Sequence, residues 1–83
     1  MSYAPTKLFV VENGFIAELL RPVLGDGWLV VSYGTGLLGH RFDHVVFRYP
    51  DRDLRGAERS MIQSYLDDQV RLKLAPAGKL VLL

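Results

Sequence analysis

The sequence contains no cysteine, and this absence excludes several kinds of chemistry at once. Without thiols the chain forms no disulfide framework, no thiolate metal site and no cysteine nucleophile. A chain without cysteine also fits a reducing compartment, so we expect a cytoplasmic location.

Long apolar runs and a surplus of one charge are missing as well. The apolar runs at 8–11 and 80–83 are far shorter than the ~18 residues of a membrane span. We therefore expect no contact with the membrane and no export signal. Ten basic and nine acidic residues give a net charge of +1, which is too balanced for binding driven by phosphate attraction. Nucleic-acid binding is accordingly not expected.

The chain has 83 residues, 49% of them hydrophobic, which predicts one small globular domain over residues 1–83. A folded chain of this size buries only about 60–65% of the surface that its unfolded form exposes. Its margin of stability is therefore small, which favours a partner or a dimer interface.

Hydrophobic patterning predicts the element order β-α-β-β-α-β. In the first helix, six apolar residues repeat at helical spacing. They are Phe15, Ile16, Leu19, Leu20, Val23 and Leu24. The predicted elements are a strand over 7–12, a helix over 15–24, strands over 28–33 and 44–49, a helix from Asp53, and a strand over 79–83.

Several residues mark the ends of these elements. Asn13 is a predicted N-cap and Gly25 a predicted stop for the first helix, while Pro22 predicts a kink or an early end. Asp53 is the predicted cap of the second helix. Residues 70–74 alternate in polarity, so they could instead form a hairpin with the last strand; the helix is the favoured interpretation.

Two architectures share this order. The strands are nearly continuous apolar runs, which is typical of a sheet covered on both faces and predicts an α/β domain with a mainly parallel sheet and flanking helices. The alternative is an α+β ferredoxin-like sandwich, whose two helices cover only one face. Its bare apolar face would require a homodimer.

A glycine-rich segment follows the second predicted strand. Gly34, Gly36 and Gly39 match the pattern GxGxxG, which can cradle a pyrophosphate at a helix N-terminus. Only residues 40–43 separate this segment from the next strand, which leaves no room for that helix. An irregular connection is the favoured interpretation, and an anion site formed by these glycines with Arg41 is the alternative.

Other catalytic patterns are incomplete. The sequence has no GxxxxGK[ST] phosphate loop and no GxSxG elbow. His40 and His44 are four residues apart, but a predicted strand contains His44 and nothing completes a metal site. We therefore expect no enzyme activity, no cofactor and no metal.

Residues 36–83 resemble the Walker B segment of the ATPase domain of phage large terminase subunits. In that family a glycine-containing loop leads into an apolar strand that ends in acids, followed by a charged turn, a long helix, a Pro/Gly loop and another apolar strand. The matching residues are Leu38, Gly39, Arg41 and Asp43 in the loop, Val45 to Phe47 in the strand, Pro50 and Asp53 in the turn, and Lys73 to Gly78 in the last loop.

The departure from this pattern concerns the metal-binding acids. Arg48 and Tyr49 stand where the family places its Walker B carboxylates, and a guanidinium would repel Mg²⁺. Asp51 and Asp53 begin about 10 Å further along an extended chain, so they cannot substitute. The resemblance therefore implies a phage-encoded scaffold without either nucleotide motif.

The segment 74–83, LAPAGKLVLL, also resembles the end of Rossmann-like methyltransferases. In that family a glycine-rich cofactor loop follows the first strand. Here the first strand is followed by Glu12, Asn13 and a single glycine, so the cofactor loop is missing.

Together these patterns predict a small non-catalytic accessory protein that acts through protein–protein binding or self-association. The predicted partner is another protein, for example one encoded by a host, or a second copy of the chain. Arg48, Tyr49 and Arg52 are the candidate contacts, because Arg and Tyr are enriched in interface hot spots. A simple strand end with Arg48 in water is the competing interpretation. The alternative function is a nucleotide- or anion-binding module that uses the loop 34–39.

Overall fold

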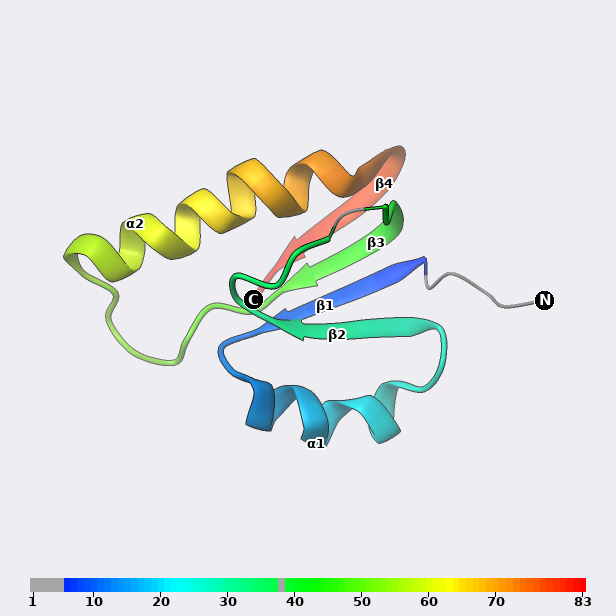
Figure 1. Cartoon of the computed structure of the whole chain (residues 1–83), viewed down its shortest axis with the longest axis horizontal. Coiled ribbons are helices and arrows are strands. Elements are labelled where there is room, and N and C mark those ends of the chain that lie inside the picture. Colours follow the sequence, from blue (N-terminus) through cyan, green and yellow to red (C-terminus); the bar gives the residue numbers. More distant parts are fainter. Residues whose placement is uncertain (1–5, 38) are drawn as a thin grey trace.

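The computed structural model describes residues 6–37 and 39–83, so Leu38 of the terminase-like loop lies outside the described residues. The chain forms one four-stranded sheet with the strand order β2-β1-β3-β4, and every neighbouring pair is parallel (Figure 1). The strands are β1 (Lys7–Val11), β2 (Trp28–Ser32), β3 (Phe42–Phe47) and β4 (Leu74–Leu82).

Two helices lie on opposite sides of this sheet (Figure 1). They are α1 (Gly14–Leu24) and α2 (Gly56–Tyr65), and α2 continues through a π turn (Leu66–Val70) and a 3₁₀ turn (Arg71–Lys73). The predicted order and the parallel α/β architecture are confirmed. The ferredoxin-like alternative is wrong, because it requires both helices on one face of the sheet.

The strands divide their side chains between two unequal cores. Alternate residues of a strand point to opposite faces, so Leu8 and Val10 face α2 whereas Phe9 and Val11 face α1. The α2 side holds the larger core, which includes the fully buried Phe47. The smaller core contains the buried residues Val11, Ala17 and Val30, and Val46 is also buried on the α1 side.

The connection from β2 to β3 crosses the α2 side of the sheet without a helix, as predicted. Leu37 of this connection is buried in the larger core. The hydroxyl of Tyr65 donates a hydrogen bond to the carbonyl of Thr35 at 2.8 Å. The glycine-rich segment thus takes the place of a helix as cover for the sheet.

The predicted ends of α1 are confirmed. The side chain of Asn13 accepts a hydrogen bond from the Ile16 amide at 3.0 Å, and Gly25 has a φ of 82°, in the left-handed region that favours glycine. Pro22 lies inside the helix, which continues to Leu24. Of the two predicted effects of Pro22, a kink or an early end, the early end is therefore wrong.

The predicted start of α2 at Asp53 is also wrong, because the helix begins at Gly56 after Arg55. Leu54 packs against the larger core from the extended connection, so the helix forms only after this anchor. The side chain of Asp53 lies 3.9 Å from Arg55 in an exposed ion pair and does not cap the helix.

Strands β3 and β4 both start earlier than the sequence predicts. Phe42 pairs with Leu74, and the next paired residues, His44 and Lys79, follow an irregular register in which β4 has extra residues. The segment from Ala75 to Gly78, predicted as a loop, therefore belongs to β4. The helical interpretation of residues 70–74 is confirmed through Lys73, so the alternative hairpin is wrong.

Candidate functional site

The glycine-rich segment does not bring its candidate anion ligands together. Gly34 follows β2 at the carboxyl edge of the sheet, whereas Arg41 precedes β3 at the amino edge. The six residues of β3 cover about 20 Å at ~3.3 Å per residue, so these ends are far apart. Gly36 lies in the crossing between them, and Gly39 adopts a φ of 81° in a turn. Gly34 and Gly36 line one small cavity beside α2, but Gly39 and Arg41 are not among its lining residues.

The three predicted contact residues lie at or beyond the end of β3. Arg48 is exposed, and its carbonyl accepts a short hydrogen bond from the Tyr33 hydroxyl. The ring of Tyr49 packs edge-on against Phe47 with centroids 5.2 Å apart. Arg52 forms ion pairs with two carboxylates of this chain. These residues share one edge, but only Arg48 projects into solvent without an ion pair among the described residues.

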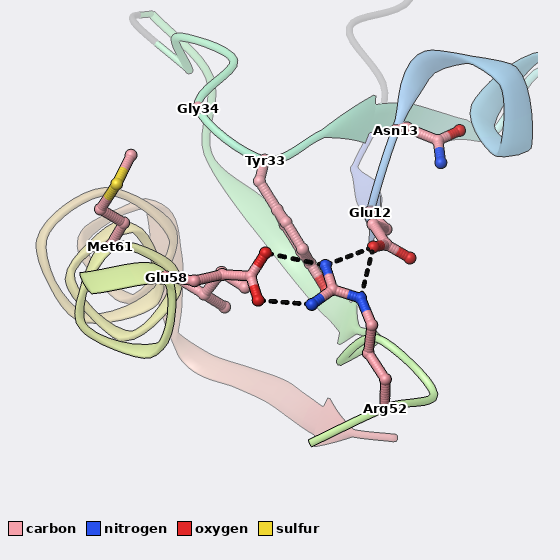
Figure 2. Close-up of a pocket in the computed structure, with 8 residues that line it drawn as sticks. Glu12, Asn13, Tyr33, Gly34, Arg52, Glu58 and Met61 are labelled. Carbon is pink, nitrogen blue, oxygen red and sulfur yellow. Dashed lines mark hydrogen bonds and ion pairs between the residues drawn. The ribbon is translucent and has the colours of Figure 1, made fainter. Parts of the chain in front are cut away.

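A cavity of about 600 Å³ opens at this edge (Figure 2). It lies where the chain order of the sheet reverses between β1 and β3, which is the usual ligand site of open parallel sheets. The residues that line it come from the ends of β1 and β2, the β3–α2 connection and α2. They are Glu12, Asn13, Tyr33, Gly34, Arg52, Glu58, Met61 and Ile62.

Arg52 lies between two carboxylates in this cavity (Figure 2). Its Nη2 is 2.8 Å from Glu12 Oε1 and 2.8 Å from Glu58 Oε2, and its Nη1 makes a further contact with Glu58. The hydrogen bonds to Glu58 and Glu12 raise the pKa of Arg52. The hydrogen bond from Arg52 lowers the pKa of Glu58. The network ties the connection to α2 and to the end of β1.

The charges of the side chains that line the cavity do not favour binding of an anion. Two carboxylates face one guanidinium, so the three side chains carry a net negative charge. Burial, with the nearby Glu12 charge as a smaller cause, raises the pKa of Tyr33 to about 12. The phenol therefore stays neutral at pH 7. An anion entering here would have to displace a carboxylate from Arg52.

Metal ligands and membrane helices are missing from the part of the chain that the structure describes. No group of three or more His, Asp or Glu side chains there could hold a metal ion. No helix within residues 6–37 and 39–83 has the length and apolar character needed to span a bilayer.

A second candidate site is an apolar stripe along one flank of α1. Phe15, Leu19 and Val23 follow each other at a spacing of four residues, and they are 74%, 58% and 77% exposed. On the other flank, Arg21 donates a hydrogen bond at 3.1 Å to the carbonyl of Val30 on the outer strand β2. Leu19 and Val23 are each two residues, or about 200° around the helix, from Arg21. The stripe therefore faces away from the edge of β2, toward β3 and β4.

The strands beside this stripe carry no helix on the α1 side in the described part of the chain. α1 lies mainly over β2, beside the outer edge of the sheet (Figure 1). Phe9, Val46 and Val81 form one row across β1, β3 and β4 on this side, and Val81 is 39% exposed. Val46, between Phe9 and Val81 in this row, is itself buried. We call the surface formed by Phe15, Leu19, Val23 and Val81 the open face.

The six apolar residues that repeat at helical spacing in the sequence do not all have the same surroundings in α1. The structure packs Ile16, Leu20 and Leu24 against the sheet and leaves the other three exposed. The sequence contains a signal for these two sets of residues, because the apolar positions come in adjacent pairs at i, i+1, i+4, i+5, i+8 and i+9. That arc is wider than one contact with a sheet requires.

Comparisons of the chain with protein-family models, curated proteins and solved structures found no match. The resemblance of residues 36–83 to terminase ATPase domains therefore stays a prediction. The function has to be argued from the geometry of the chain itself.

Proposed function

We propose that this chain is a non-catalytic protein-binding module that works through the open face. The observation that carries the proposal is the stripe of Phe15, Leu19 and Val23, exposed on the flank of α1 that faces strands without a helix in the described part of the chain. Single exposed apolar residues are ordinary, but a joined apolar surface of this kind marks an interaction site.

Covering the stripe releases a useful amount of free energy. Full burial of one large apolar side chain contributes about 1.5–3 kcal/mol, so burial of these three largely exposed side chains contributes about 3–6 kcal/mol. Association costs on the order of 4–15 kcal/mol in lost freedom. The stripe alone does not hold a partner, and the neighbouring strands must contribute as well.

The ends of the strands support a function without catalysis. The position that would hold metal-binding acids in a Walker B strand is occupied by Arg48, which is exposed, and by Tyr49, which packs on the core. Phage origin, a host-encoded partner and a cytoplasmic location remain part of the proposal. They rest on the sequence resemblance and on the lack of cysteine.

A small-molecule site at the carboxyl edge is the second candidate function. The cavity there has a volume in the range of ligand pockets, about 300–1,000 Å³, and lies where such sheets bind ligands. Its net negative charge argues against ATP or NAD. Calorimetric titration with ATP, NAD and S-adenosylmethionine separates the two functions, and saturable heat with any of them would favour the pocket.

Binding of an apolar fluorescent dye, such as anilinonaphthalene sulfonate, tests the main proposal. At low micromolar protein, the wild-type chain should enhance the dye's fluorescence and Leu19→Asp should lose most of that enhancement. Leu72→Asp is the matched control, because Leu72 is 69% exposed but lies outside the open face. Equal enhancement by all three folded proteins would contradict the proposal.

A further inference from the structure

We propose that the occupant of the open face is a second copy of this chain. The two copies form a dimer whose two-fold axis runs parallel to the strands, between two α1 helices. This inference rests on the proposed function and adds the identity of the partner.

The open face has room for one more helix. Parallel sheets are stable when helices cover both faces, but on the α1 side the described structure covers mainly β2 and β1. The strands β3 and β4, over which no described helix lies on this side, are together about 10 Å wide, since neighbouring strands lie ~4.8 Å apart. An α-helix with its side chains has a diameter of about 10–12 Å. Each copy therefore presents one helix and one vacant helix position beside it.

Only one orientation of a two-fold axis fills both vacancies when two such sheets face each other. An axis parallel to the strands exchanges the two halves of the sheet, so the α1 helix of each copy lies over β3 and β4 of the other. An axis across the strands keeps α1 over the same half, and the two helices would occupy the same space. The strand-parallel axis also keeps the two amino edges together.

This symmetry brings the apolar stripes into contact with each other. Phe15, Leu19 and Val23 point along the helix layer toward the vacant position, where the axis places the second α1. In an isologous contact, residues near the axis meet their own counterparts. Leu19, in the middle of the stripe, should therefore lie against Leu19 of the second copy.

The charges around the open face are compatible with this contact. Glu18 pairs with Arg21 on the exposed surface of α1, so it brings no unpaired charge to the second copy. Lys79 lies on β4 at the amino edge, and Asp26 lies in the turn after α1 at the same edge. The axis moves Asp26 of one copy to the β4 side of the other, where Lys79 lies. This placement provides a polar rim around the apolar centre.

The required area also favours the combined contact of helix and strands. Stable complexes bury about 800 Å² on each partner. Three side chains of one stripe do not supply this area, so two helices touching only each other would associate weakly. Packing α1 onto β3 and β4 of the second copy adds two helix-on-sheet contacts, one in each direction.

Single-cysteine variants test the arrangement directly, because the natural chain has no cysteine. Under mild oxidation, Leu19→Cys should form a disulfide-linked dimer at least tenfold faster than Leu72→Cys. In sedimentation equilibrium at millimolar concentration, the wild-type chain and Leu72→Asp should have the mass of a dimer, and Leu19→Asp the mass of a monomer. The far-ultraviolet circular dichroism of each variant checks that it is folded.

Two results would overturn the inference. One is a monomeric wild-type chain up to millimolar concentration. The other is a dimer in which Leu19→Cys cross-links no faster than Leu72→Cys. Dye binding separates this failure from failure of the proposed function. A monomer whose dye binding depends on Leu19 leaves the open face as a binding site for a different protein, whereas a monomer without such binding removes both proposals.

Discussion

The same substitution, phenylalanine to alanine, should change the free energy of unfolding little in α1 and strongly in β3. Phe15 is 74% exposed and Phe47 is fully buried. Full burial of such a side chain contributes about 1.5–3 kcal/mol, so the partial burial of Phe15 contributes less than about 1 kcal/mol. Alanine is also the better helix former, by about 0.5 kcal/mol. Phe15→Ala should therefore change the free energy of unfolding of the monomer by less than about 1 kcal/mol.

Phe47→Ala should remove a large part of the stability. Truncating a buried phenylalanine costs about 3–5 kcal/mol, because the lost transfer free energy is accompanied by a cavity. An 83-residue domain has a total stability of about 4–12 kcal/mol at 0.05–0.15 kcal/mol per residue. Urea unfolding measures both variants through the fluorescence of Trp28, the only tryptophan. With an unchanged slope, a shift in midpoint reports the change in stability.

Protein concentration adds a second measurement to this comparison. A dimer stabilises the folded state by mass action, so the wild-type midpoint should rise as the concentration rises. The midpoint of Phe15→Ala should not rise. If Phe15→Ala lowers the midpoint as much as Phe47→Ala does at low concentration, the stripe belongs to the packing of the monomer. The open face would then not be free to bind a partner.

Three further predictions concern the fold. Gly78→Ala should lower the free energy of unfolding by about 1–3 kcal/mol, measured by urea unfolding. The added Cβ would lie 2.7 Å from a side-chain atom and 3.0 and 3.1 Å from two carbonyl oxygens. Gly27→Ala is the control, because its Cβ would meet nothing within 4 Å. Arg52→Ala should lower stability at pH 7 and flatten its loss in acid. Arg52 lowers the pKa of Glu58, so the ion pair stabilises the fold above the ordinary carboxyl pKa of about 4.3. This stabilisation disappears as the pH falls through the lower pKa that Glu58 has in the folded chain. Unchanged acid unfolding in Arg52→Ala would count against the ion pair. Burial raises the pKa of Tyr65 to about 12, so stability should fall between pH 10 and 12 as the unfolded chain ionises first; Tyr65→Phe should weaken this fall, and an unaltered alkaline transition would argue against it.

The architecture could be predicted from the sequence because it follows from local sequence patterns. Continuous apolar strands indicated a sheet covered on both faces, and Asn13 and Gly25 marked the ends of α1 through their own backbone preferences. The start of α2 was predicted wrongly because it depends on a tertiary contact. Leu54 packs on the core from an extended segment, and a local capping preference at Asp53 does not compete with that burial.

The candidate site was harder to predict, because it depends on which strands a helix covers. The prediction of Arg48, Tyr49 and Arg52 rests on their chemical type and on their place after a strand. Only the fold shows that Arg52 is held by Glu12 and Glu58. The open face likewise needs the strand order, since its exposure follows from α1 lying over β2 rather than over the middle of the sheet.

Amide NMR spectra, recorded from low micromolar to millimolar protein, test most directly whether the open face is the surface that binds. The account predicts concentration-dependent shifts at Leu19 in α1 and at Val81 in β4, with little change at Gly34 beside the carboxyl-edge cavity. Shifts confined to Gly34 and its neighbours, with Leu19 and Val81 unchanged, would contradict it.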